Sequence, residues 1–175
     1  MKTQSKHSWV RRGFTLLELL IVVAIIGILM GLLASALYRA KMNAKRAQIR
    51  TDVRIIGSGI RAFRTEYGTW PWDSVKTGLV SFQKDNYKIL EPMKGDAPSN
   101  PYHIQFLSWN ELFTTNSTGE RVPLGDYSET HAKCAVVDPW RTPYIIELDF
   151  SNDVGRVKCG TPYDVLKADP PVHTF

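Results

Sequence analysis

Residues 13–38 read G-F-T-L-L-E-L-L-I-V-V-A-I-I-G-I-L-M-G-L-L-A-S-A-L-Y. Between Phe14 and Leu37 the chain is apolar or small, and Glu18 is its only charged residue. At about 1.5 Å per residue, a helix of this length would measure roughly 36 Å, enough to cross a bilayer core of about 30 Å. The stretch therefore predicts a transmembrane helix over residues 14–38.

Glu18 is the unusual residue of this stretch, because an acid at membrane depth costs about 2.5–3.5 kcal/mol and persists only where something compensates its charge. If the chain were cut after Gly13, Phe14 would carry a new α-amino group that is protonated below about pH 8. That amine would lie near Glu18 within one helix, or it could meet Glu18 of a neighbouring copy. An intermolecular pair of opposite charges would also fix the register of the subunits. We therefore expect Glu18 to be an assembly contact.

The segment R-R-G-F-T-L-L-E-L-L-I-V-V-A-I-I-G-I-L resembles the cleavage and methylation segment of type IV prepilins and of type II secretion pseudopilins. The resemblance includes the small residue Gly13 before the cut, Phe14 after it, and Glu18 four residues further on. It implies that residues 1–13 are a leader peptide. It also implies that prepilin peptidase cuts between Gly13 and Phe14 and methylates the new amine, and that the subunits polymerise through this helix.

Two other readings of the N-terminus stay open. An ordinary signal peptide also has a basic start, and Ala34-Ser35-Ala36 supplies a small-residue cleavage site. Its apolar region, however, is only about 7–15 residues long and would not contain Glu18. A plain single-span membrane anchor explains the length of the stretch but leaves Glu18 unexplained.

The charges are unevenly distributed along the chain. The formal net charge is +5, yet residues 65–175 contain ten basic and fifteen acidic residues, while residues 39–64 contain eight basic residues and a single acid. The globular part therefore has no basic face to offer a nucleic acid. The basic residues after the span favour a cytoplasmic C-terminus. The resemblance implies the opposite, an inner-membrane protein with a periplasmic globular domain, and we follow the resemblance.

The two cysteines, Cys134 and Cys159, fit an oxidising compartment if they form a disulfide. Two free thiols explain them equally well, because a single pair of cysteines defines no disulfide framework.

An amphipathic helix is predicted to continue the span over residues 39–67. Its apolar stripe recurs at spacings of four and three: Ile49, Val53, Ile56, Ile60, Phe63 and Tyr67. Gly57 and Gly59 weaken this prediction by up to about 1 kcal/mol each relative to Ala. Gly68 is a natural C-cap, and Pro71 follows closely enough to prevent the helix from resuming.

Residues 68–175 are predicted to form one globular domain of short helical turns, loops and antiparallel strands, which makes the chain an α+β protein. A helical turn is expected around residues 87–93, a polar loop over 114–133 and a hairpin turn over 151–155. The expected strands cover residues 102–107, 135–137, 144–149, 156–159 and 163–166. The resemblance implies the same arrangement, a pilin-like long helix packed on a small antiparallel sheet.

The segment D-P-W-R-T-P-Y at residues 138–144 resembles the D-P-W-G-x-P-Y segment of the major pseudopilin of type II secretion. Tyr67-Gly68-Thr69-Trp70-Pro71 is similar to the loop after the helix in that family. Arg141 stands where the family usually has Gly, which leaves the geometry of this turn open. From the residues alone, Asp138 is expected to accept bonds from the following amides and Trp140 to anchor the turn on the core.

The resemblance also implies calcium, which major pseudopilins bind near their last strands. The comparable oxygen cluster here is Asp149, Ser151, Asn152 and Asp153, whereas calcium takes six to eight oxygens. The family's longer glycine-rich loop is not recognisable, and turn chemistry favours a plain polar hairpin turn. Both readings, a calcium site and a turn, stay open.

No pattern of catalytic residues is present in the sequence. The four histidines, at positions 7, 103, 131 and 173, are scattered, and no nucleophile elbow or phosphate-binding glycine loop occurs. We therefore expect a structural subunit rather than an enzyme. It would join other pseudopilins and the inner-membrane assembly platform in a periplasmic pseudopilus for type II secretion.

The alternatives are a type IV pilin for adhesion, motility or DNA uptake, and a membrane-anchored periplasmic protein that binds a ligand through the loops around Trp70 and Trp72.

Overall fold

The computed structural model describes residues 14–72, 77–116, 118–124, 135–161 and 172–175. It divides into two compact units, Met1–Met42 and Asn43–Phe175. The predicted leader and the expected strand at 163–166 lie outside the described residues.

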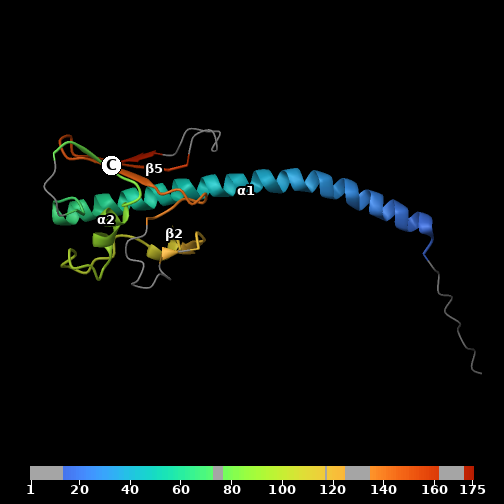
Figure 1. Cartoon of the computed structure of the whole chain (residues 1–175), viewed down its shortest axis with the longest axis horizontal. Helices are drawn as coiled ribbons and strands as arrows, with labels where there is room; N and C mark the ends of the chain where they lie inside the picture. Colours follow the sequence, from blue (N-terminus) through green and yellow to red (C-terminus); the bar gives the residue numbers. More distant parts are fainter. Residues whose placement is uncertain (1–13, 73–76, 117, 125–134, 162–171) are drawn as a thin grey trace, which may run out of the picture. The chain divides into compact units, whose positions relative to one another are not determined.

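Helix α1, Leu16–Tyr67, contributes to both units (Figure 1). It ends where the sequence predicts. The amide of Gly68 donates to the carbonyl of Arg64 at 2.8 Å, and Gly68 has a φ of 70°. A glycine adopts this left-handed conformation without steric cost, which is why helices end at such residues.

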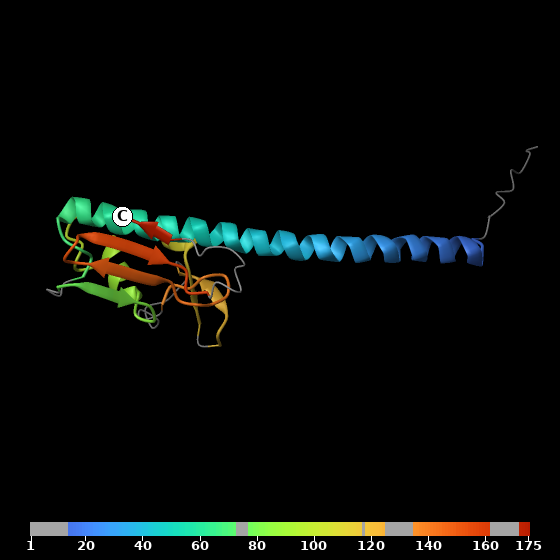
Figure 2. The same ribbon diagram turned by 90° about the horizontal axis from the view of Figure 1, so that it is seen from above.

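In the second unit, a four-stranded antiparallel sheet forms beside the C-terminal half of α1 (Figure 2). Its strand order is β1-β4-β5-β6, with the bounds Leu79–Phe82, Ile145–Asp149, Val154–Lys158 and Val172–Thr174. The register pairs Ile146 of β4 with Val157 of β5 and with Phe82 of β1, so that these side chains share one face. The predicted α+β architecture, a long helix with a small antiparallel sheet, is confirmed.

Smaller elements complete the unit. A two-stranded sheet pairs β2, Phe113–Thr115, with β3, Arg121–Pro123. Helix α2, Tyr87–Leu90, continues into the 3-10 turn η1, Glu91–Met93, as the sequence predicts for this region. A second 3-10 turn, η2, covers Trp109–Glu111.

The core lies between α1 and the strands and helical turns of the second unit. The predicted apolar stripe of the helix faces this core: Ile49, Val53, Ile56, Ile60 and Phe63 are buried, and Tyr67 packs at its edge. From the rest of the unit the core receives the side chains of Phe82, Ile89, Leu90, Leu112, Tyr144, Ile146 and Leu148.

Gly57 and Gly59 do not interrupt the helix. A Cβ at Gly59 would lie 2.8 Å from the carbonyl oxygen of Phe106, and a Cβ at Gly57 would overlap the imidazole of His173. The absence of side chains therefore lets the loop and strand β6 approach the helix closely.

Two strand predictions were wrong. Residues 102–107 form no strand, and the side chain of Asn100 bonds both backbone groups of Ile104 in the middle of this stretch. Its amide nitrogen donates to the carbonyls of Lys94 and Ile104, and its oxygen accepts from the amide of Ile104. Residues 135–137 form only isolated bridges, to Thr114 and Pro143.

Strands β1, β2, β3 and β6 were not predicted. Each has only three or four residues, too short for a clear alternation of apolar and polar side chains.

Candidate assembly segment and its support

The N-terminus of α1 is closed by a reciprocal cap between Thr15 and Glu18. The Thr15 amide and hydroxyl donate to Glu18 Oε2 at 2.9 and 2.8 Å, and the Glu18 amide donates to Thr15 Oγ1 at 3.2 Å. This is the capping box, in which a threonine and a glutamate three residues later satisfy each other's backbone groups. The Glu18 carboxylate is therefore oriented toward the start of its own helix, where the helix dipole favours a negative charge.

The sequence analysis missed the role of Thr15, although the T-x-x-E pattern preceding an apolar run is the signal for it. The cap would offset part of the free-energy cost of placing the Glu18 carboxylate in a membrane, because Oε2 accepts two hydrogen bonds within one chain. No described residue carries a positive charge that pairs with Glu18. Gly13 lies outside the described residues, so the cleavage and assembly roles of Gly13, Phe14 and Glu18 stay predictions.

The apolar surface that follows the cap is exposed along the first unit. Phe14 is 80% exposed and Leu16 88% exposed. In the part of the chain that the structure describes, one helix, α1, is long and apolar enough to cross a membrane, and none of its most apolar window is buried. A continuous apolar surface of this kind calls for lipid or for another protein chain.

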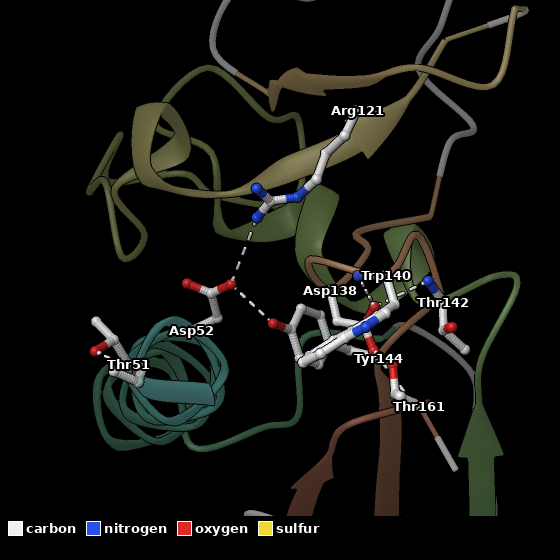
Figure 3. Close-up of polar contacts among 9 residues, drawn as sticks. Thr51, Asp52, Arg121, Asp138, Trp140, Thr142, Tyr144 and Thr161 are labelled. Atoms are coloured by element: carbon white, nitrogen blue, oxygen red, sulfur yellow. Dashed lines mark hydrogen bonds and ion pairs between the residues drawn. The ribbon is translucent and has the colours of Figure 1, made fainter. Parts of the chain in front are cut away.

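In the second unit, Asp52 is buried on the helix face that meets the domain. The Tyr144 hydroxyl donates to Asp52 Oδ2 at 2.8 Å, and Arg121 Nη2 lies 4.0 Å from the same oxygen (Figure 3). Burial raises the pKa of Asp52 to about 6, against the opposing effects of the Tyr144 hydroxyl and the Arg121 charge. Burial and the Asp52 charge together raise the pKa of Tyr144, which keeps its hydroxyl protonated as the donor.

Asp138 organises the turn of residues 138–144. Its Oδ1 accepts from the amides of Trp140 at 2.8 Å and Thr142 at 3.0 Å, and its Oδ2 accepts from the Thr161 amide at 3.1 Å and from the Thr161 hydroxyl (Figure 3). The predicted acceptor role of Asp138 is confirmed. Trp140 packs against the core as predicted, and Lys45 Nζ lies 5.0 Å from its ring centroid.

Arg141, at the position where the family usually has Gly, has a φ of 68°. It therefore adopts the left-handed conformation that glycine adopts most easily. The turn keeps a geometry suited to glycine although the residue is an arginine.

The candidate calcium residues form the turn of the β4–β5 hairpin. Asp149 Oδ1 accepts from the amides of Ser151 and Asn152 at 3.0 and 3.1 Å, and its Oδ2 accepts from the Asn152 side chain at 2.7 Å. These bonds hold the pKa of Asp149 below its usual value. Ser151 Oγ accepts from the Gly78 amide, and Asp153 pairs with Arg64. Among the described residues no group of three or more histidine, cysteine or acidic side chains could hold a metal.

Cys159 is a free, buried thiol that donates to the Thr161 carbonyl at 3.5 Å. Burial raises the pKa of this thiol to about 11. Cys134 lies outside the described residues, so the two readings of the sequence, a disulfide and two free thiols, are not tested.

The tryptophans of the alternative ligand-binding reading pack against the core. The Arg64 guanidinium lies 4.3 Å from the ring centroid of Trp70, whose ring also contacts Phe150 and Phe175. Trp72 meets Phe82 edge-on, with centroids 4.2 Å apart.

The comparisons agree with the N-terminal motif. Residues 10–34 match the model of the prokaryotic N-terminal methylation motif. The chain is 35% identical over 88 residues to the type IV major pilin protein PilE of Neisseria gonorrhoeae, a match covering 48% of this chain and 50% of the relative. It is 33% identical over 81 residues to the fimbrial protein EcpC of Eikenella corrodens, covering 45% of this chain and 51% of the relative.

The chain thus spans about half the length of the curated relatives it matches. No solved structure matches it significantly.

Proposed function

We propose that this chain, type IV pilin-like by its methylation motif and its relatives, is a pseudopilin of a type II secretion system. A prepilin peptidase would cut it between Gly13 and Phe14 and methylate the new amine. The mature chain would then polymerise through helix α1 into a periplasmic pseudopilus. The observation that carries the proposal is the exposed apolar part of α1, in whose first turn Thr15 orients the carboxylate of Glu18. The similarity to structural pilin subunits supports the prediction that the chain is not an enzyme.

The capping box suggests how Glu18 serves both the single chain and the filament. Within one chain, Thr15 holds the carboxylate at the start of the helix, next to the residue that would carry the new amine. A carboxylate with two lone pairs occupied can still accept from a further donor. The amine of Phe14 in a neighbouring copy would therefore pair with a carboxylate that is already oriented.

The exposed apolar surface would be covered in two successive environments. In the inner membrane, as a single pass with the globular domain in the periplasm, it would be covered by lipid. In the filament it would pack against the same segment of other copies, other pseudopilins included, after transfer by the inner-membrane assembly platform. No nucleic acid has a place in this scheme.

A second candidate, a type IV pilin, is favoured by the names of the relatives, which are major pilins and fimbrial proteins. We prefer the pseudopilin because residues 138–144 resemble the D-P-W-G-x-P-Y turn of that family, and because Arg141 takes a backbone conformation suited to the glycine of that pattern. Retention of normally secreted proteins in the periplasm of a deletion strain would favour the pseudopilin. Loss of surface pili with normal secretion would favour the pilin.

Calcium binding by Asp149, Ser151 and Asp153 remains part of the proposal. Calcium would have to displace Arg64 from Asp153, so binding should raise the melting temperature more in an Arg64→Gln variant than in the wild type. If the wild type and Arg64→Gln each melt at the same temperature with calcium as with chelator, the calcium site is dismissed.

The assembly role is tested by three variants of the full chain expressed with its assembly machinery. Glu18→Ala removes both the cap and the charge. Glu18→Gln removes the charge but keeps a side chain that can complete the capping box. Thr15→Val removes the cap and keeps the charge.

We expect all three to be recovered in the membrane fraction and the wild-type mature chain to begin at Phe14. Filaments extracted from the periplasm should lack both Glu18 variants, since neither can pair with an amine, and should contain Thr15→Val at reduced yield. Wild-type incorporation of Glu18→Ala would sink the proposal. Wild-type incorporation of Glu18→Gln alone would show that the cap, rather than the charge pair, is what assembly requires.

A further inference from the structure

Three arginines form a stripe on the outer surface of α1 in the second unit. Arg50, Arg54 and Arg61 follow one another at spacings of four and seven residues, which places them on one face of the helix. All three side chains are exposed, and none makes an ion pair with a described residue. The stripe extends over about 16 Å of helix.

Strand β6 adds a fourth donor to this surface. The imidazole of His173 packs against Gly57, which lies three residues after Arg54 and four before Arg61. Burial lowers the pKa of His173, and the charges of Arg61 and Arg54 lower it further. Neither arginine makes an ion pair with a described residue, so no described carboxylate pairs with the guanidinium groups beside His173. We call Arg50, Arg54, Arg61 and His173 the arginine surface.

The same unit carries a complementary acidic segment. Several acids are already paired within the chain: Asp85 with Lys88, Glu147 with Lys158, and Asp153 with Arg64. Glu91 and Asp96, in contrast, are exposed and make no ion pair with a described residue. They follow α2 on either side of Lys94, and we call the two acids, Glu91 and Asp96, the acidic turn.

The two surfaces lie on different sides of the domain. Figure 1 shows α2 on one side of α1, and β5 with the C-terminus on the other. The acidic turn continues from α2, whereas β6, which carries His173, pairs with β5. The acidic turn of one copy therefore cannot pair with the arginine surface of the same copy, but it can pair with the arginine surface of a second copy.

We propose that the arginine surface of one copy binds the acidic turn, Glu91 and Asp96, of a second copy. The contact joins different surfaces of the two copies, and such a heterologous contact generates an open helical filament when the rotation does not close. The proposal rests on the proposed function, because it needs copies of this chain to assemble side by side. It adds a charged contact between globular domains to the apolar contact between N-terminal helices.

Charge reversal and its compensation test the contact in the full chain. One variant carries Arg54→Glu and Arg61→Glu, a second carries Glu91→Arg and Asp96→Arg, and a third carries all four substitutions. Lys84→Glu is the matched control, since Lys84 is an exposed cation that belongs to neither surface. Membrane recovery, cleavage before Phe14 and resistance of the domain to protease are measured alongside the yield of filaments extracted from the periplasm.

We expect each double variant to lose at least about tenfold in filament yield, because like charges then face each other across the contact. The variant with all four substitutions should recover most of the wild-type filament yield, and Lys84→Glu should assemble as the wild type does. Wild-type yield in either double variant, or failure of the variant with all four substitutions to recover, overturns the inference.

These outcomes are distinct from failure of the proposed function. In that case the wild-type chain itself would give no filaments, whatever the charges of its globular domain, and Glu18→Ala would change nothing.

Discussion

Asp52 illustrates how a single buried charge ties the helix to the rest of its domain. It is 3% exposed, and its hydroxyl partner Tyr144 and cationic partner Arg121 come from two different parts of the unit. The sequence analysis counted Asp52 only as the single acid of residues 39–64 and did not predict its burial. Its partners were not predicted either, because they lie 92 and 69 residues away and no local pattern connects them.

The raised pKa of Asp52 predicts that this residue makes stability fall as pH rises. The folded chain holds its proton up to a pKa of about 6, while the ordinary value is 3.8, so between these values the folded state binds more protons than the unfolded state. The contribution is therefore fully present below the ordinary pKa and is lost as pH rises through about 6. Two pKa units correspond to about 3 kcal/mol, an upper limit for one residue.

Thermal melts of the detergent-solubilised chain at several pH values between about 4 and 7 measure this effect. Asp52→Asn should have a flatter stability profile than the wild type across that window, because Asn does not titrate. Tyr144→Phe, which removes a bond that lowers the pKa of Asp52, should move the loss to higher pH. The same slope in the wild type and in Asp52→Asn would assign the pH dependence to groups other than Asp52.

Arg141 gives a second prediction at the residue scale. A non-glycine residue in the left-handed region costs about 1–2 kcal/mol, so Arg141→Gly should relieve this strain. Glycine also gains freedom in the unfolded chain, which offsets part of the effect and leaves a net stabilisation of about 0.5–1 kcal/mol. Thermal melts of the two chains measure it.

Arg141→Ala is the matched control, because alanine removes the charge but keeps the Cβ that causes the strain. If alanine stabilises the chain as much as glycine does, the arginine side chain rather than its backbone conformation is responsible. The conformation itself could have been predicted from the resemblance, since the residue stands at a glycine position.

At the scale of the element, α1 shows what the sequence could and could not establish. The spacing of Ile49, Val53, Ile56 and Ile60 identified the buried face, and Gly68 identified the end, because both signals are local. The hairpin of β4 and β5 was predicted for the same reason. The strand expected over residues 102–107 failed, because a side-chain amide, that of Asn100, bonds the backbone there.

The glycines of α1 were the misleading signal, and Gly59 supports a prediction about the element. Helix propensity alone says that Gly59→Ala should stabilise by about 1 kcal/mol. The new Cβ would, however, lie 2.5 Å from Leu107 Cδ2 and 2.8 Å from the Phe106 carbonyl oxygen. Overpacking of this kind costs about 1–3 kcal/mol, and a backbone oxygen yields less readily than a flexible side chain, so we expect net destabilisation.

Ser58→Ala is the control for Gly59→Ala, since Ser58 is the exposed neighbour in the same helix. It should leave the melting temperature unchanged or raise it slightly. If Gly59→Ala raises the melting temperature as much as Ser58→Ala does, the loop of residues 106–107 leaves room for a Cβ at position 59.

At the scale of the whole molecule, the two units differ in what their surfaces require. The core of the second unit begins at Ile49, and every buried hydrophobic side chain of the described residues belongs to that unit. The first unit exposes its apolar side chains from Phe14 to Tyr38. The sequence predicted this division from the length of the apolar run and the later amphipathic stripe. What it could not predict was the surface of the second unit, because the arginine surface requires β6, a strand too short to recognise.

A chain that begins at Asn43 should therefore fold on its own and, at a salt concentration that screens the arginine surface, remain monomeric in water without detergent. It keeps the whole described core, the sheet and the Asp52 and Asp138 networks, and it loses the exposed apolar surface that calls for lipid or for other copies. Its melting temperature should match that of the detergent-solubilised full chain, and sedimentation should give the mass of one copy. A chain that begins at Arg54 is the control: it lacks Ile49 and Val53, each worth about 1.5–3 kcal/mol of burial, and it also lacks Asp52, so it should unfold at markedly lower temperature. If the chain from Asn43 is unfolded, the second unit does not fold on its own. If both truncated chains melt at the same temperature, the helix before Arg54 does not stabilise the domain, and Ile49 and Val53 do not contribute to its core.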